Sequence, residues 1–131
     1  MREILFRGKR MDNGDWVYGY YVHIGPVSCQ RTYIIPEYAS ALYVNEVDPS
    51  TVGQYTGLKD KNGKRIFEGD IAKVLQGKDK DIAYVGFENG AFMLYPKTGN
   101  IYERTLWEYW YNDWDVEVIG NITDNPELLE K

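Results

Sequence analysis

Hydrophobic and polar residues alternate along much of the N-terminal part of the chain, with the period of two that is typical of β-strands. The alternation predicts strands over residues 2–7, 16–24 and 32–35, followed by an extended segment over 42–47. Turn-forming residues at 8–15 make the first two strands a hairpin. Because residues 16–24 carry bulky side chains at odd and even positions, we expect a central strand or one packed on both faces.

Two Asn-Gly pairs mark tight turns in the second half of the chain, at Asn62-Gly63 and Asn89-Gly90. Both residue types tolerate a positive φ, and such pairs join the strands of β-hairpins. The neighbouring alternation predicts strands over four segments: residues 71–75, 82–87, 92–95 and 115–122. From residue 69 to residue 94 the order is strand, loop, strand, tight turn and strand, which is typical of a small SH3-like barrel.

The alternation breaks at residues 106–114, where Leu106, Trp110 and Trp114 are spaced at i, i+4 and i+8. This spacing predicts a short helix. A second helix is predicted to begin at Asn125-Pro126, because Asn is a common N-cap and Pro suits the first helical position.

These elements predict a mainly β fold in one domain, residues 1–131, since a chain of this length can bury one ordinary core. We expect an N-terminal β part over residues 1–50 and a barrel-like β part over 51–131 that ends in the short C-terminal helix. We see no internal repeat, low-complexity segment or linker that would mark a second domain.

The segment over residues 51–71 is punctuated by glycines and reads TVGQYTGLKDKNGKRIFEGDI. It resembles the YopX family of phage and prophage proteins, whose members carry a segment of this pattern. The start of the chain, MREILFR, and its end, EVIGNI followed by NPELL, also resemble the opening and close of that family. The resemblance therefore spans nearly the whole chain, and it is weakest at residues 25–44 and 107–114.

The resemblance implies an origin in a phage or prophage, and hence the cytoplasm of a bacterial host. It brings no assigned activity and no catalytic residues with it. The family-motif residues of this chain that we expect at turns are Gly57, Asp60, Gly63, Glu68, Gly69 and Asp70.

Composition and charge limit the classes of function. With 44% hydrophobic and 27% charged residues, the chain is globular rather than disordered. The formal net charge of −5 argues against a general duplex-DNA binder, because neutralising phosphates supplies most non-specific affinity. A single cysteine, Cys29, excludes an internal disulfide and a cysteine-rich zinc site. We expect no membrane segment, since no apolar run approaches the roughly 20 residues of a span. We also expect no signal peptide, because Arg2, Glu3 and Arg7 surround only a short apolar segment.

Three carboxylates of the family motif, Asp60, Glu68 and Asp70, lie close together in the sequence. One interpretation is a divalent-metal site of an enzyme. The other is turn chemistry, in which Asp side chains accept hydrogen bonds from nearby backbone N–H groups. We favour the second, because no His or Cys accompanies these carboxylates.

We expect no catalytic residue, metal or cofactor, and therefore no enzyme. His23 is the only histidine, and it lies in a predicted strand without an acid or nucleophile nearby in the sequence. Cys29 lacks a second cysteine or a close histidine, which makes it an unpromising nucleophile.

A cluster of aromatic residues is the most unusual feature of the chain. It could serve as an interface with a protein partner or as a stacking platform for single-stranded nucleic acid. It could also be core, although one short element cannot turn all of these side chains inwards. The members are Trp107, Tyr109, Trp110, Tyr111 and Trp114.

Basic residues gather on two predicted turns. They could form a surface that contacts nucleic acid, or they could be solubilising charges whose field is weakened by neighbouring aspartates. We favour the second interpretation. The candidates are Lys59, Lys61, Lys64 and Arg65 on the first turn and Lys78 and Lys80 on the second.

From the sequence we therefore hypothesise a non-catalytic phage or prophage accessory protein that acts through self-association or a protein partner. The alternative is a nucleic-acid-binding module that uses the turn lysines and exposed aromatic residues. A metal-dependent enzyme built on the motif carboxylates is the least favoured hypothesis.

Overall fold

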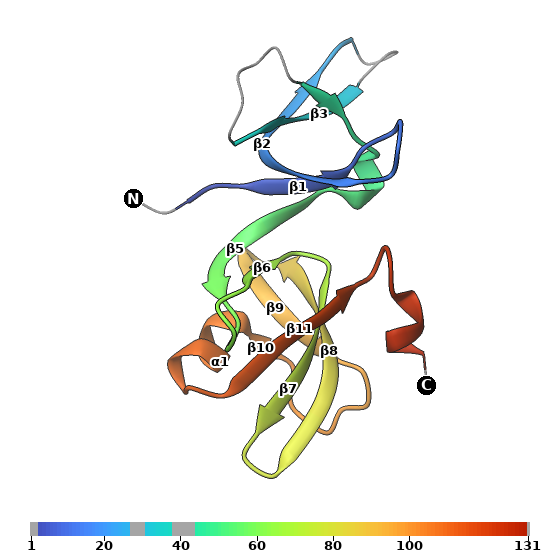
Figure 1. Ribbon diagram of the computed structural model, residues 1–131. Helices are drawn as coiled ribbons and strands as arrows, with labels where there is room; N and C mark the ends of the chain where they lie inside the picture. Colours follow the sequence, from blue (N-terminus) through green and yellow to red (C-terminus); the bar gives the residue numbers. More distant parts are fainter. Residues whose placement is uncertain (1–2, 27–30, 38–43, 131) are drawn as a thin grey trace. The chain divides into compact units, whose positions relative to one another are not determined.

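A computed structural model describes residues 3–26, 31–37 and 44–130 of the chain (Figure 1). The fold is mainly β, as predicted, and its strand pairs are antiparallel. The chain divides into two compact units, Met1–Tyr55 and Thr56–Lys131. The boundary lies within a strand, a little after the position at which we separated the two predicted β parts.

The described strands of the first unit are β1 (Phe6–Lys9), β2 (Trp16–Ile24), β3 (Arg31–Pro36) and β4 (Asn45–Glu46). They lie in the order β4-β3-β2-β1, and the start of β5 (Gly53–Lys59) pairs with β1. A 3-10 helix at Pro49–Thr51 leads into β5, and its N-cap Asp48 accepts a hydrogen bond from the Ser50 backbone N–H. The chain therefore turns at Asp48.

The core of the first unit contains Val17, Ile34 and Val47. Strand β2 is central, as predicted, because it pairs with β1 on one side and β3 on the other. It is not packed on both faces, since Tyr18 and Tyr20 are exposed. Tyrosine suits a half-wet strand surface, so bulky residues alone did not indicate burial.

The second unit contains a five-stranded meander in the order β10-β9-β8-β7-β11. Its strands are β7 (Asp70–Gln76), β8 (Asp79–Glu88), β9 (Ala91–Pro96), β10 (Arg104–Thr105) and β11 (Asp115–Asn121), and β6 (Arg65–Phe67) follows β5. Alternate residues of these strands point inwards and form the core with one helix, α1 (Leu106–Tyr111). The buried members are Ile66, Ala72, Val74, Ala83, Val85, Leu94, Ile101, Leu106, Tyr109 and Val116.

The meander is an open sheet with β10 and β11 at its edges, so the predicted SH3-like barrel is not confirmed. Two hydrogen bonds connect the turn after β5 to the β11 edge. The Lys61 backbone N–H donates to the Val116 carbonyl at 3.0 Å, and the Val118 backbone N–H donates to Asp60 Oδ2 at 2.9 Å. The Asp60 side chain thus accepts a hydrogen bond from a β11 backbone N–H that a neighbouring strand would otherwise accept.

Both predicted helices are shorter than expected. Helix α1 ends at Tyr111, so Trp114 lies outside it. The C-terminal helix is a 3-10 helix at Pro126–Leu129. Asn125 occupies the N-cap position and Pro126 opens the helix, as predicted, but the Asn125 side chain makes no capping bond and instead accepts a hydrogen bond from the Asn121 backbone N–H at 3.2 Å.

The Asp60→Ala substitution should lower the free energy of unfolding by about 2–3 kcal/mol, because three backbone donors lose a charged acceptor. Those donors are the N–H groups of Asn62, Lys64 and Val118. Urea unfolding measures the change, with the exposed Asp79→Ala as the matched control. Equal losses in the two variants would contradict the structural role of Asp60.

Candidate functional site

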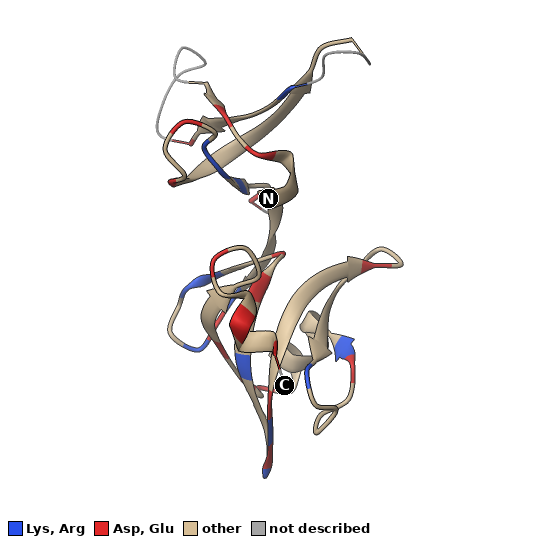
Figure 2. Ribbon diagram, turned by 90° about the vertical axis from the view of Figure 1, so that its right-hand side faces the viewer, with Lys and Arg blue, Asp and Glu red and all other residues tan. Residues whose placement is uncertain are grey.

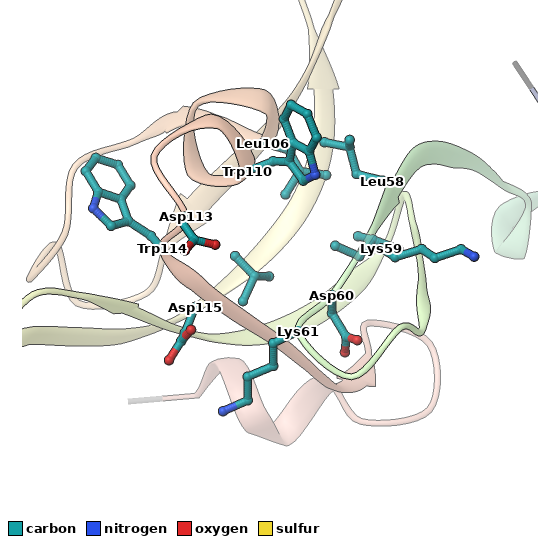
Figure 3. Close-up of a pocket in the computed structure, with 11 residues that line it drawn as sticks. Leu58, Lys59, Asp60, Lys61, Leu106, Trp110, Asp113, Trp114 and Asp115 are labelled. Atoms are coloured by element: carbon teal, nitrogen blue, oxygen red, sulfur yellow. The ribbon is translucent and has the colours of Figure 1, made fainter.

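The end of α1, the turn after β5 and the start of β11 surround a cavity of about 230 Å³ in the second unit (Figure 3). The apolar side chains of Leu58, Leu106 and Val116 are among the residues that line it. Its volume is below the roughly 300–1,000 Å³ typical of pockets for drug-sized ligands. The cavity therefore has room for one large side chain or ring rather than for a complete cofactor.

The aromatic cluster divides into a buried and an exposed set. Trp107, Trp110 and Tyr111 are 55%, 58% and 68% exposed, and we call them the α1 aromatic surface. Tyr109 is fully buried, and its ring meets that of Trp114 edge to face with centroids 5.1 Å apart. The sequence left open whether the cluster is core or surface, and the structure shows that it is divided between the two.

Helical spacing explains this division. The exposed residues are Trp107, Trp110 and Tyr111, at i, i+3 and i+4, and this spacing puts them on one side of a helix. Leu106 and Tyr109 occupy the other side and enter the core. The Trp107 and Tyr111 rings stack with centroids 4.9 Å apart. Each side of α1 thus carries an aromatic residue, so hydrophobicity alone could not show which side faces the solvent.

Hydrogen bonds anchor α1 and its buried tyrosine. The Thr105 hydroxyl caps the helix by accepting from the Glu108 backbone N–H at 3.2 Å. The Tyr109 hydroxyl donates to the Tyr102 carbonyl at 3.2 Å. Burial raises the pKa of Tyr109, and the Arg104 charge only partly opposes this effect. The hydroxyl therefore stays protonated and acts as a donor at neutral pH.

Two of the three carboxylates of the family motif, Asp60 and Asp70, accept hydrogen bonds from backbone groups at turns. Asp60 Oδ1 accepts from the N–H groups of Asn62 and Lys64, both at 2.9 Å. Asp70 is buried, and its Oδ2 accepts from the Phe67 N–H at 2.7 Å, across the turn that contains Glu68 and Gly69. These contacts are the turn chemistry that we favoured.

Gly63 and Gly69 lie at these turns, whereas Gly57, which we also expected at a turn, lies within strand β5. Gly57, Gly63 and Gly69 have φ values of 87°, 81° and 91°, a region that glycine enters without a steric cost. Within the described residues, no group of three His, Cys, Asp or Glu side chains is placed to hold a metal ion.

The candidate basic residues do not form one patch. Lys59 and Lys61 line the cavity, and Lys61 Nζ lies 3.5 Å from a Glu117 carboxylate oxygen. Lys64 is exposed on the turn, and Arg65 is half-buried in β6. In Figure 2 the basic and acidic positions of the second unit are interspersed.

The second group of lysines lies elsewhere. Lys78 and Lys80 are exposed near the turn between β7 and β8, and Lys80 lines a different cavity of about 340 Å³ together with Lys73 and Lys97. Asp81 also lines this second cavity. The two predicted basic turns therefore do not converge on one cavity.

Asp81 organises the loop beside that second cavity. Burial by itself raises the pKa of Asp81, but hydrogen bonds from Thr98, Ile82 and Asn100 outweigh it and leave the pKa below its usual value. Since the folded state favours the charged form, this stabilisation is present above the ordinary carboxyl pKa. It is lost as the pH falls through the lowered value.

His23 makes a structural contact. Its Nδ1 lies 3.0 Å from the Thr32 hydroxyl oxygen, and its ring stacks near that of Tyr21. Cys29 lies outside the described residues. Within the described part of the chain, no helix is long and apolar enough to cross a membrane.

Comparisons with known proteins agree with the motif and with the fold. A family model described as YopX protein matches residues 5–130. The chain belongs to the YopX family. The family resemblance that the segment over residues 51–71 suggested is thereby confirmed, and it extends over nearly the full length of the chain.

A solved structure has a similar fold. The crystal structure of protein EF1440 from Enterococcus faecalis is similar at 23% sequence identity with a TM-score of 0.56. The alignment covers 99% of this chain and 100% of that chain. At this identity the likeness concerns the fold alone. No curated protein matches the chain.

The turn after α1 gives a stability prediction for this YopX-family chain. Asp113 has a φ of 57°, and the Asp113 and Trp114 N–H groups donate to the Trp110 and Tyr109 carbonyls at 3.2 and 3.1 Å. This Schellman geometry favours glycine, so Asp113→Gly should raise the free energy of unfolding by about 0.5–1 kcal/mol.

Thermal unfolding measures that change. The control is Asp115→Gly in strand β11, which should lower stability because glycine weakens an extended segment. A loss of stability in Asp113→Gly would contradict the interpretation of this turn.

Proposed function

We propose that this protein is a non-catalytic accessory protein of a phage or prophage, and that it acts in the bacterial host cytoplasm by binding protein. The binding partner is another protein or a second copy of the chain. The observation that supports the proposal most directly is the α1 aromatic surface. Three large aromatic side chains stand more than half exposed on a helix of six residues.

Exposing such an apolar surface to water is unfavourable unless a partner covers it. Monomeric proteins rarely expose large contiguous apolar patches, and those that exist often mark interaction sites. Tryptophan and tyrosine are also enriched among the residues that contribute most of the binding energy at protein interfaces. The α1 aromatic surface has both the exposure and the residue types of an interface.

The surface is also held in place before binding. Trp107 and Tyr111 stack on each other, and α1 is anchored to the core through Leu106 and Tyr109. Aromatic side chains have few rotatable bonds, so little conformational entropy is lost when a partner covers them. The short helix therefore presents an ordered surface.

The double substitution Trp107→Ala/Tyr111→Ala tests self-association through this surface. Light scattering on the eluate of a sizing column should give a mass above the 15.3 kDa of one chain for the wild type. The double variant should return to one chain, because the apolar contact area is removed. Tyr20→Ala, which removes an exposed aromatic residue of the first unit, should associate like the wild type.

A photo-crosslinking amino acid at position 111 tests association with another protein in bacterial cells. The expected result is an adduct from position 111 and none from position 20. A wild type of one-chain mass that also gives no adduct from position 111 would contradict the proposal.

A nucleic-acid-binding module is the second candidate function. Lys59 and Lys61 line the same cavity as the exposed Trp110. An aromatic ring near lysines can stack a base while the lysines attract phosphates. The net charge of −5 and the Lys61–Glu117 ion pair oppose this function.

This second function predicts that a fluorescent single-stranded oligonucleotide binds at low salt, with an affinity that falls as salt increases. Trp110→Ala and Lys59→Ala should each weaken binding, whereas Lys78→Ala, at the other turn, should not. Fluorescence anisotropy measures the affinity. No binding at about 10 μM protein would exclude an affinity of physiological use, since even non-specific binding reaches 10⁻⁴–10⁻⁶ M.

A further inference from the structure

Charged residues surround the cavity beside α1, which we call the α1 cavity. Their positive and negative groups do not cancel on the side that faces its interior. Five charged residues line it: Lys59, Asp60, Lys61, Asp113 and Asp115. Asp60 is occupied by three backbone N–H donors, and Lys61 lies beside Glu117. In Figure 3 the ammonium ends of Lys59 and Lys61 point away from α1.

Of the two remaining carboxylates, Asp113 lies between Trp110 and Trp114 in Figure 3, whereas Asp115 lies farther from Trp110. Asp113 follows α1 and Asp115 begins β11, so both are fixed by their backbone. Neither side chain has a hydrogen bond or ion pair to another residue in the described part of the chain. Figure 3 shows the Asp113 carboxylate turned towards the middle of the residues that line the cavity.

The other walls of the cavity are apolar and aromatic. Trp110 is 58% exposed at the cavity, and Leu58 lies beside it in Figure 3. A carboxylate next to an accessible indole suits a guanidinium group, which forms paired hydrogen bonds with a carboxylate and stacks on an aromatic face. The methylene groups of the same side chain would contact the apolar wall.

From these features we infer that the α1 cavity binds an arginine side chain of a basic segment in a partner protein. This inference rests on the proposed function, since it states which chemistry the partner brings to the α1 aromatic surface. The cavity volume of about 230 Å³ suits one long side chain. The net charge of −5 favours the approach of a basic partner.

A pair of short peptides tests the inference. One is a soluble Gly-Ser peptide with a central Leu-Arg-Leu, and the other replaces its arginine by citrulline, which has a similar shape and no charge. Backbone and indole N–H signals of the ¹⁵N-labelled protein are followed by NMR during titration. The arginine peptide should shift the Trp110 indole and the Asp113 amide. The citrulline peptide should bind about tenfold more weakly, as expected when a charge-assisted pair is lost.

Substitutions assign the binding to the proposed groups. The double variant Asp113→Asn/Asp115→Asn should weaken binding of the arginine peptide by about tenfold, and asparagine tolerates the positive φ at position 113. Asp79→Asn, which removes a charge at the turn between β7 and β8, should leave the affinity unchanged. Asp113→Gly, which should be the more stable protein, should still bind more weakly, so a loss of binding cannot be assigned to unfolding.

Three results would overturn the inference. These are no shift of the Trp110 indole at about 5 mM arginine peptide, equal binding of the arginine and citrulline peptides, or equal binding of a peptide with glutamate in place of arginine. Since millimolar affinity corresponds to only about 4 kcal/mol, such a titration detects even a weak site.

The same experiments separate this inference from the proposed function. An adduct from position 111 without arginine binding overturns the inference and keeps the proposed function. Arginine binding without any adduct or association supports the cavity as an arginine site and contradicts the wider function. An adduct that contains only a second copy of the chain overturns a separate partner protein as the occupant.

Discussion

The Asp60 carboxylate is the contact on which the second unit depends most. One oxygen holds the turn between β5 and β6 by accepting from Asn62 and Lys64, and the other reaches the Val118 N–H on β11. A buried carboxylate is favourable only when such donors replace its hydration. Here they do so and at the same time join segments that are far apart in the sequence. The cavity exists because this turn and the start of β11 are held side by side.

Helix α1 depends on the same core for its existence. A helix of six residues is unstable by itself, because forming the first turn costs more than its hydrogen bonds return. Leu106 and Tyr109 supply the missing stability by packing in the core. The outer side of the helix carries tryptophan and tyrosine that are not part of this buried core. This separation leaves the α1 aromatic surface available for the protein contact that we propose.

Local signals in the sequence predicted the turns and the main strands. Gly63, Asn89 and Gly90 have the positive φ values that the Asn-Gly pairs indicated. The strands beside them follow because alternation is a local property. The burial of α1 could not be predicted in the same way, since each side of it carries an aromatic residue. The end of α1 could not be predicted either, because Asp113 occupies the position at which a glycine usually marks the end of a helix.

The cavity was beyond sequence reasoning for a different reason. Its walls come from Leu58 to Lys61 and from Leu106 to Val116, and no local pattern records that these segments meet. The motif pointed correctly to Asp60 as a turn residue but gave no sign of its bond to Val118. Likewise, the sequence offered Lys59 and Lys61 as candidates for contact with nucleic acid, whereas in the structure Lys61 forms an ion pair with Glu117.

Trp110 belongs both to the α1 aromatic surface and to the wall of the cavity. A partner that covers the surface gains most of its affinity from apolar area, which is not directional. A charged side chain in the cavity would add about tenfold in affinity, as expected of a charge-assisted pair, and it would also fix the orientation of the partner and reject partners of the wrong charge. Because the Trp110 indole takes part in both contacts, either contact would order this side chain for the other. Binding at the two places is therefore expected to be mutually reinforcing.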